Sequence, residues 1–267
     1  MILIAILMGT LAAGIGSVWL AAVLSFGVLA RYTQHMLSLA AGALLATAFM
    51  HLLPEAFESQ ASAHDLFATL LVGLVFFFLL DKAELWHHGH EHHDVGGHDH
   101  GDHGDHAHDH GHHQQAKSGA WAVLAGDSVH AFGDGILIAS AFMADLRLGI
   151  VASLAVLVHE VPHHMGDLVV LRQSSNNNRR AALVKVSMAG AVTALGGIVG
   201  YALVDQLYAY LPFFLIVASS SFVYVALADL IPQLQKRVTP RETAAQISWL
   251  LIGIAMVTLI SGIAHAH

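Results

Sequence analysis

The stretch VHEVPHHMGD lies inside an otherwise apolar segment and carries five ionisable side chains, His159, Glu160, His163, His164 and Asp167. His159, His163 and Asp167 are spaced four residues apart, so on a helix they would form one stripe. Each charged side chain at the centre of a bilayer costs roughly 2.5–3.5 kcal/mol on insertion scales. A bound divalent cation would offset that cost, because zinc accepts imidazole nitrogen and carboxylate oxygen as ligands.

A second polar stretch, GDSVHAFGDG, opens the preceding apolar segment. Asp127, His130 and Asp134 fall at positions i, i+3 and i+7 and therefore share one helix face. His130 and Asp134 by themselves form an i, i+4 chelating pair, and the later stretch offers another such pair. Two successive segments with donors at similar depth favour one shared metal site, whose expected ligands are His130, Asp134, His159, Glu160 and His163.

Three further side chains, Asp127, His164 and Asp167, are expected either to support those ligands or to line the path of the ion. Metal binding requires neutral imidazole and ionised carboxylate, so affinity should fall at acid pH. Pro162 removes one hydrogen bond from the helix, which a membrane tolerates where the backbone faces a cavity.

The composition is typical of a membrane protein. Of 267 residues, 56% are hydrophobic and 11% are charged, and the mean hydropathy is +0.63, whereas soluble proteins are about 25% charged. The absence of cysteine excludes disulfides and thiolate ligands. The net charge is −8 and the sequence has no basic patch, which excludes nucleic acid as a partner.

Apolar runs of about 20 residues are long enough to cross the hydrocarbon core of a membrane as helices. The chain contains runs of this kind near 2–30, 35–57, 65–86, 119–144, 147–172, 182–204, 209–235 and 244–265. We therefore predict an all-α polytopic membrane protein with eight transmembrane helices, in which residues 1–267 form a single membrane domain. An even number of spans places both termini on the same side.

The orientation follows from lysine and arginine, which favour cytoplasmic connections. Of the eleven basic residues, ten flank the odd-numbered connections and only Arg147 lies in an even-numbered one. We therefore expect the odd-numbered connections in the cytoplasm and both termini outside. The compact length favours the inner membrane of a bacterium as the location of this integral membrane protein.

Residues 87–113 form a low-complexity segment that holds 13 of the 22 histidines and no lysine or arginine. So polar a segment cannot build a core, and a disordered cytoplasmic loop is expected. Imidazole and carboxylate at this density bind borderline divalent metals such as zinc. This favours metal capture or sensing over a tract that only improves solubility.

The second and seventh spans share a local pattern, AFMHLLPE at 48–55 and ALADLIPQ at 226–233. These spans run in opposite directions in the predicted topology, as inverted repeats do in transporters with midplane sites. A chance match of so short a pattern is the alternative. Asp229 is expected to contact the ion near its exit, and His51 is expected on the path or behind the ligands.

HAFGDG (130–135) and HEVPHHMGD (159–167) resemble HNFxDG and HExPHExGD, the fourth- and fifth-span motifs of a subgroup of the ZIP (Zrt-, Irt-like) metal-ion transporters. HLLPEAF (51–57) and YVALADLIPQL (224–234) resemble that subgroup's second and seventh spans. The resemblance covers essentially the whole chain. It implies a 3+2+3 inverted-repeat arrangement, often in a homodimer, that takes up divalent metal, chiefly zinc and also iron, manganese or cadmium.

The family's metal-site positions match those predicted above, His130, Asp134, His159, Glu160 and His163. The sequence departs from the family motifs at two positions. Ala131 replaces the usual Asn, and His164 replaces the usual Glu. The sixth span, around 189–200, also offers no carboxylate. The resemblance therefore implies one well-formed metal site, and ligand softness favours zinc over manganese.

Three other functions compete with uptake. HEVPH is an HExxH string, the signature of zinc metalloproteases, but Pro162 would disturb the turn that holds both histidines in register. A cation-efflux carrier of the diffusion-facilitator type also uses HxxxD pairs, but six spans and a soluble C-terminal domain would be expected. A receptor or sensor would bind metal without any flux.

The sequence thus predicts an all-helical carrier that moves zinc or a similar divalent ion inward. It is expected to be no enzyme, with no catalytic residues and no cofactor. The mechanism would be alternating access, in which one group of helices rocks against another around a fixed midplane site.

Deletion of residues 87–113 tests the role of the His-rich loop. Because the expected transport ligands lie elsewhere, the deletion should change regulation or metal retention more than turnover. Zinc uptake into proteoliposomes, compared with the full chain, measures both. Loss of all transport would contradict this assignment.

Overall fold

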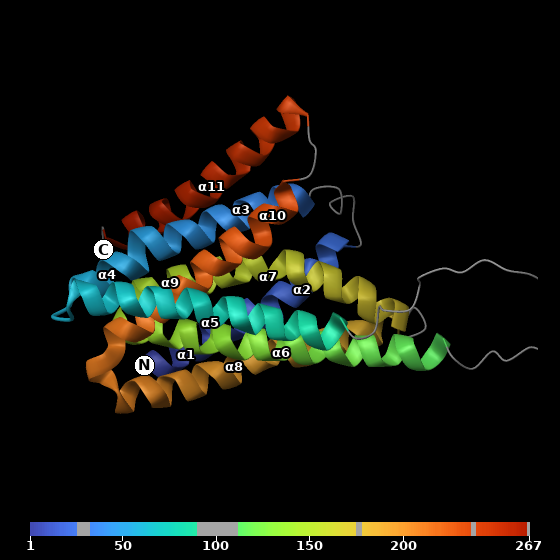
Figure 1. The fold of residues 1–267 in the computed structure, drawn as a ribbon, viewed down its shortest axis with the longest axis horizontal. Helices are drawn as coiled ribbons and strands as arrows, with labels where there is room; N and C mark the ends of the chain where they lie inside the picture. The colour runs from blue at the N-terminus through green and yellow to red at the C-terminus, as the bar shows by residue number, and fades with distance from the viewer. Residues whose placement is uncertain (26–32, 90–111, 175–177, 236–238, 266–267) are drawn as a thin grey trace, which may run out of the picture.

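Every regular element in the described part of the chain is a helix, and no strand occurs there (Figure 1). The all-α prediction is thereby confirmed for these residues. The computed structural model describes the backbone of all residues except 26–32, 90–111, 175–177, 236–238 and 266–267. Side chains are described for the same residues except 25, 83–89, 112–123, 173–174 and 263–265.

The elements follow one another along the chain as a series of long helices, three of which contain a π-helical turn. In order they are α1 (Ile2–Leu11), η1 (Ala12–Gly16), α2 (Ser17–Ser25), α3 (Thr33–Thr47), η3 (Ala48–Leu52), α4 (Leu53–Phe57), α5 (Ala63–Gly89), α6 (His112–Ala144), α7 (Leu146–Ser174), α8 (Arg179–Gln206), η4 (Tyr208–Tyr210), α9 (Leu211–Tyr224), η5 (Val225–Leu230), α10 (Ile231–Leu234) and α11 (Pro240–His265).

Seven helices in the described residues are long and apolar enough to cross a membrane, and they coincide with predicted spans to within a few residues. The remaining predicted span, 119–144, corresponds to α6, which is not among the seven. Its described part carries Asp127, His130 and Asp134, whose polarity lowers its hydropathy. The count of eight spans and the 3+2+3 arrangement therefore stay predictions.

The predicted His-rich loop lies mainly outside the described residues. Helix α5 extends to Gly89 and α6 begins at His112, so the two ends of the 87–113 segment belong to helices. Residues 90–111 between them are not described. The beginning of α1 and the end of α11 lie at the same end of the bundle (Figure 1).

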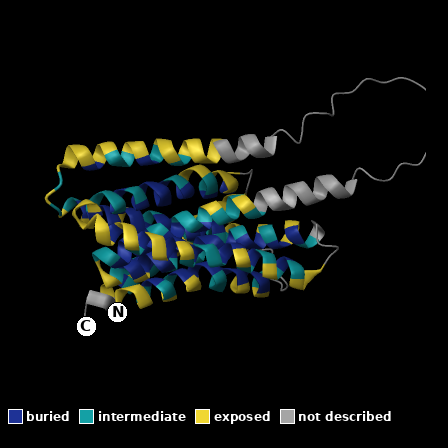
Figure 2. Ribbon diagram, turned by 90° about the horizontal axis from the view of Figure 1, so that it is seen from below, coloured by how far each residue is buried: buried dark blue, intermediate teal, exposed yellow. Residues whose placement is uncertain are grey.

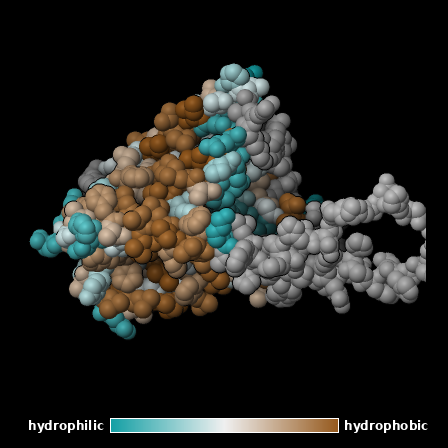
Figure 3. All heavy atoms as spheres, in the orientation of Figure 1, coloured by the Kyte–Doolittle hydropathy of each residue, from teal (hydrophilic) through white to brown (hydrophobic). Residues whose placement is uncertain are grey.

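The surface of the bundle carries a broad apolar band between two polar ends (Figure 3). Large apolar side chains are exposed along the outer helices, for example Leu71, Val72 and Leu79 of α5 and Leu251 of α11. Figure 2 shows the contrast between the mostly exposed α5 and the buried interior. An exposed apolar area of this extent is unusual in a soluble monomer, and it matches a helix bundle that faces lipid.

Helix α6 contacts α1, α7, α8 and α9, with its most extensive interface against α8. Glycines make that interface close. A Cβ atom at Gly135 would collide with the backbone carbonyl of Thr193, and one at Gly196 would collide with the carbonyl of Phe132. Small residues permit such close approach of helices in lipid, so α6 is held firmly while its other face meets α7.

Comparison of Gly135→Ala with Gly133→Ala tests this packing. Gly133 lies two residues away on the same helix, and a Cβ there would meet no atom within 4 Å. Overpacking costs typically about 1–3 kcal/mol, so Gly135→Ala should lower the apparent melting temperature in detergent. Gly133→Ala should leave it unchanged or raise it, because alanine favours helix by about 1 kcal/mol. Equal melting temperatures for the two variants would contradict the close contact.

The second and seventh predicted spans share a backbone feature as well as a sequence pattern. In each, a π-helical turn (η3 or η5) is followed by a short α-helix with proline at one of its first two positions. The proline lies six residues after Ala48 in one span and six after Ala226 in the other. A proline ring clashes with the carbonyl four residues earlier, and a π-helical turn is one local adjustment that makes room for it.

The two halves of this pattern run in opposite directions. In Figure 1, α3 and α4 run toward the end that holds both termini, and α9 to α10 runs away from it. The shared π turn and proline support a repeat over a chance match, because unrelated segments have no reason to share both. The inverted repeat of the whole chain stays a prediction.

Candidate metal centre

Two antiparallel helices, α6 and α7, position the candidate ligands. They are joined at Asp145, whose Oδ1 accepts a hydrogen bond from the backbone N–H of Arg147 at 2.8 Å and so begins α7. So short a connection makes α6 and α7 antiparallel neighbours. Helix α7 continues through Pro162, which is buried in its interior.

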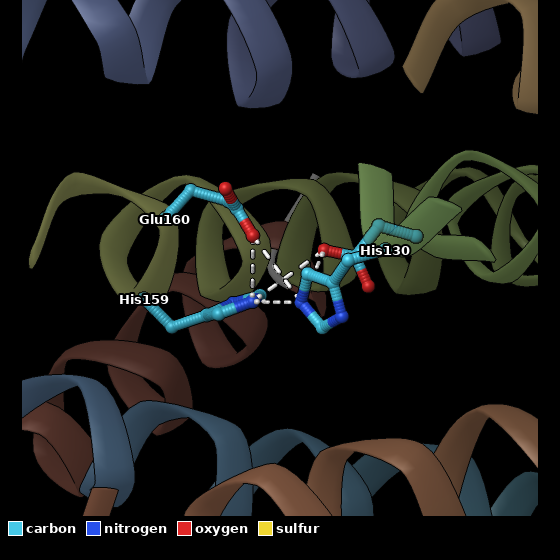
Figure 4. A group of neighbouring side chains, drawn as sticks. His130, His159 and Glu160 are labelled. Atoms are coloured by element: carbon cyan, nitrogen blue, oxygen red, sulfur yellow. Dashed lines mark hydrogen bonds and ion pairs between the residues drawn. The ribbon is translucent and has the colours of Figure 1, made fainter. Parts of the chain in front are cut away.

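Four of the five predicted ligands converge on one point between these helices, as Figure 4 shows for His130, His159 and Glu160. Nε2 of His159 lies 3.1 Å from Glu160 Oε1, 3.4 Å from Asp134 Oδ2 and 3.5 Å from His130 Nε2. Nε2 of His130 lies 3.4 Å from Glu160 Oε1 and 3.8 Å from Asp134 Oδ2.

These separations are those of zinc ligands. Ligand bonds of about 2.0–2.1 Å in a tetrahedron place neighbouring donors about 3.3 Å apart. The four donor atoms lie within 4.8 Å of one another, and most of the measured pairs are within a few tenths of an ångström of the ideal edge. The group has two imidazole nitrogens and two carboxylates, so two ionised carboxylates would neutralise one divalent ion.

The hydrogen bond behind His159 selects one tautomer of its neutral ring. Its Nδ1 lies 3.3 Å from the carbonyl oxygen of Ala155, and a carbonyl can only accept, which assigns the hydrogen to Nδ1. In the neutral ring that metal binding requires, the lone pair of Nε2 is then directed at the other three donors. Metal-binding histidines are oriented in this way by a backbone carbonyl or carboxylate behind them.

Burial of these four side chains is energetically unfavourable when no cation is bound. The side chains of His159, Asp134 and Glu160 are 1%, 3% and 4% exposed, and that of His130 is 35% exposed. Within the described residues, no hydrogen bond of good geometry reaches Asp134 Oδ2 or Glu160 Oε1. Buried carboxylate oxygens without partners are unfavourable, and a divalent ion at the centre would satisfy them.

The fifth predicted ligand, His163, has another partner in this structure. Its Nε2 lies 3.0 Å from Asp229 Oδ2 of η5, and Gln233 donates a hydrogen bond to the other oxygen of Asp229 at 2.9 Å. The His163 ring remains near the group, about 6 Å between centroids from His130 and His159. Its role as a ligand stays a prediction.

Apart from Asp229, the remaining candidate side chains lie in two places. Asp127, His164 and Asp167 form a second group between α6 and α7, with ligand atoms within 4.8 Å of one another. His51 lies elsewhere, in η3, where its Nδ1 is 3.4 Å from Ser261 Oγ of α11. Its place on the ion path therefore stays a prediction.

Two contributing side chains were not singled out in the sequence. Ser17 of α2 places its Oγ 3.0 Å from Nδ1 of His164, and Gln233 holds Asp229 as described above. The only local signal for Ser17 is a polar residue in an apolar run. Gln233 lies four residues after Asp229, a spacing that pairs side chains on a helix.

A family model described as ZIP Zinc transporter matches residues 1–261. The chain belongs to this family. The family resemblance inferred from the two motifs is thereby confirmed, and together with the seven candidate spans it identifies an integral membrane protein. Members of the ZIP family are transporters, so the prediction that the chain is no enzyme is confirmed and the metalloprotease alternative is removed.

Three proteins similar to this chain are also named zinc transporters. The chain is 34% identical over 155 residues to zinc transporter zipt-7.2 of Caenorhabditis elegans, covering 55% of this chain and 33% of that protein. It is 27% identical over 285 residues to zinc transporter ZIP13 of Pongo abelii, covering 96% and 77%. Human zinc transporter ZIP4 is 34% identical over 142 residues, covering 53% and 21%. The chain thus spans a third or less of the length of two of these relatives.

Because His163 contacts Asp229, removal of His159 and removal of His163 should lower zinc affinity to different extents. His159→Ala removes a buried donor at the centre of the group and should weaken zinc binding by 100-fold or more, since loss even of supporting residues typically costs 10–100-fold. His163→Ala should weaken it less, because His163 is held by Asp229. Competition with a fluorescent zinc chelator measures both affinities.

His64→Ala is a matched control, because the side chain of His64 is 90% exposed. It should bind zinc as the unaltered chain does. Equal losses for His159→Ala and His163→Ala would show that His163 leaves Asp229 and joins the ion.

Proposed function

We propose that this ZIP-family protein transports divalent metal ions, zinc above all, across a membrane into the cytoplasm. The observation that supports the proposal most directly is the convergence of His130, Asp134, His159 and Glu160 at the spacing of tetrahedral zinc ligands. Family membership and the zinc-transporter names of the relatives agree with it. Iron, manganese and cadmium are further candidate substrates.

Alternating access around this site is the proposed mechanism. His130, His163 and Asp229 form the accessible edge of the site, with side chains 34–39% exposed, whereas His159 is almost fully buried. An ion would therefore enter or leave past these three residues. The contact between His163 and Asp229 joins α7 to η5, so movement of η5 relative to α7 would change access to the site.

The direction of transport is proposed from charge. Lysine and arginine flank the connections predicted to be cytoplasmic, and Asp229 lies near the end of its helical segment on that side. In this orientation, both termini lie on the outer side of the membrane. The membrane itself is proposed to be the inner membrane of a bacterium. Association as a homodimer is proposed from the family resemblance alone.

The chemical step is exchange of water for protein ligands. A divalent ion loses hydration when it enters an apolar bundle, and the two buried carboxylates and two imidazoles replace it. The apolar helices around the group lower the local dielectric, which strengthens the attraction between ion and carboxylate. Release then requires that a ligand be exchanged for water or for another protein group.

Transport into proteoliposomes tests the proposal. The purified chain should carry radioactive zinc inward in a saturable manner, and His130→Ala and His159→Ala should reduce the rate at least 10-fold. His64→Ala should keep the rate of the unaltered chain. Expression and monodispersity of all variants control for folding.

Two results would contradict the proposal. Saturable uptake that survives both ligand substitutions would place the transport site elsewhere. Flux of zinc only from the cytoplasmic face outward, in vesicles of known orientation, would indicate efflux.

A further inference from the structure

A groove opens at one end of the bundle, where α10 ends and α11 begins. Its volume is about 330 Å³, and its walls belong to α3, α10 and the first part of α11. This volume lies within the range of ligand sites, about 300–1,000 Å³. None of the candidate metal ligands lines this space, which is called the α10–α11 groove below.

The groove exists because α11 packs closely on α3 over only part of its length. A Cβ atom at Gly42 of α3 would collide with the backbone carbonyl of Leu250, and one at Gly253 of α11 would collide with the carbonyl of Leu39. Toward its beginning, α11 diverges from α3 (Figure 1). The space between the diverging helices is bounded by α10 on its third side.

The polarity of the groove changes along its length. Gln235, Thr243 and Gln246 line the end where α10 ends and α11 begins. At this polar end, Gln246 Nε2 donates a hydrogen bond to the carbonyl of Leu234 at 3.4 Å and so connects α11 to α10. The deeper part of the groove is lined by Ile231, Ile247 and Leu250. A polar end that leads into an apolar space matches the two parts of a phospholipid.

The groove lies at the edge of the apolar band of the bundle. The beginning of α11 lies where apolar surface gives way to polar side chains (Figure 3). Trp249, next to Leu250 in the sequence, stacks on His35 of α3 with ring centroids 5.9 Å apart, and tryptophan is enriched at the interface between headgroups and hydrocarbon. Ile247 is 55% exposed, so the deeper part of the groove is open to acyl chains.

The polar end of the groove is rich in positive charge. Arg241 is exposed in the first turn of α11, and Lys236 and Arg237 directly follow Gln235 in the sequence. Between residues 235 and 250 the only acidic residue is Glu242, which accepts two hydrogen bonds at the start of α11, at 2.7 and 2.9 Å. Basic residues next to a transmembrane helix attract anionic lipid headgroups.

We propose that the α10–α11 groove binds one anionic phospholipid from the leaflet at its polar end. The acyl chain lies between Ile231 of α10 and Leu250 of α11. The phosphate lies at the polar end, where the amide of Gln235 can donate hydrogen bonds to it and the neighbouring basic residues balance its charge. The site does not depend on the substrate or the direction of transport.

Two other occupants fit the groove less well. The His-rich loop is too polar for the deeper part, because burial of a polar group without a hydrogen bond is unfavourable. A helix of a second copy of the chain is about 10 Å across, so less than one turn of it would fill about 330 Å³. An acyl chain is narrow and apolar, and the surrounding membrane supplies it.

A lipid in this groove would restrain the helix that holds Asp229. Gln233 of α10 donates a hydrogen bond to Asp229 at 2.9 Å, and Ile231 and Leu234 on either side of it in the sequence both line the groove. An acyl chain packed on these two residues would hold α10 against α11. Under the proposed function, this contact would connect the composition of the membrane to the accessible edge of the metal site.

Native mass spectrometry of the purified full chain in detergent tests the binding site. The probes are dioleoyl phosphatidylglycerol, which is anionic, and dioleoyl phosphatidylcholine, added at equal concentrations. The unaltered chain should retain one phosphatidylglycerol in preference to phosphatidylcholine. Thr243→Phe places a ring in the groove and should weaken this retention about 10-fold or more, since the ring and the lipid compete for one space.

Ala244→Phe is the matched control, because residue 244 is exposed on the same helix and does not line the groove. It should retain phosphatidylglycerol as the unaltered chain does. Equal retention of the two lipids by the unaltered chain, or equal losses in the two variants, would overturn the proposed lipid site. Either result leaves the proposed transport of metal untouched, because no metal enters the measurement.

A measurement on the unaltered chain decides the matter if Thr243→Phe fails to fold. Phosphatidylglycerol with a photoreactive group in its acyl chain is incorporated with the chain into phosphatidylcholine vesicles and activated by light. The label should concentrate on the peptides that contain Ile231 and Ile247. Labelling no stronger there than on α5, whose Leu71 and Val72 are exposed to bulk lipid, would overturn the proposal.

Discussion

The constraint that governs this structure is the presence of ionisable groups inside an apolar helix bundle. Asp134, Glu160, His159 and His164 are buried, and a carboxylate that loses water needs a partner. All four side chains lie on the facing sides of α6 and α7. Each carboxylate then lies near imidazole nitrogens, a donor set that favours a divalent cation.

Close packing of α6 makes the arrangement rigid. Glycines at 135 and 196 bring its backbone against α8, so α6 has little freedom to move away from that helix. Its opposite side meets α7, which carries the HEVPHHMGD stretch. Ser17 of α2 and the carbonyl of Ala155 then orient His164 and His159. The positions of these side chains therefore depend in part on α2 and α8, which contribute no ligand of their own.

Under the proposed mechanism, the π-helical turns before Pro54 and Pro232 would serve movement of the helices. One of them, η5, carries Asp229, which holds His163. A π turn is a local departure from regular helix geometry that is frequent at functional sites. Its position beside the accessible edge of the candidate metal site would, under the proposed mechanism, connect the predicted repeat to a change in access.

The spacing of residues along the sequence was enough to predict much of this structure. Long apolar runs predicted the helices and their ends to within a few residues, because hydrocarbon accepts only segments that satisfy their own backbone hydrogen bonds. Spacing within two motifs predicted four residues that do converge, since residues four apart share a helix face. The tertiary structure decided the rest: that His163 lies on Asp229, that Ser17 orients His164, and that Glu160 faces two groups at once. These contacts join residues distant in the chain or depend on the direction of one side chain, and the periodicity of a single helix contains no information on either.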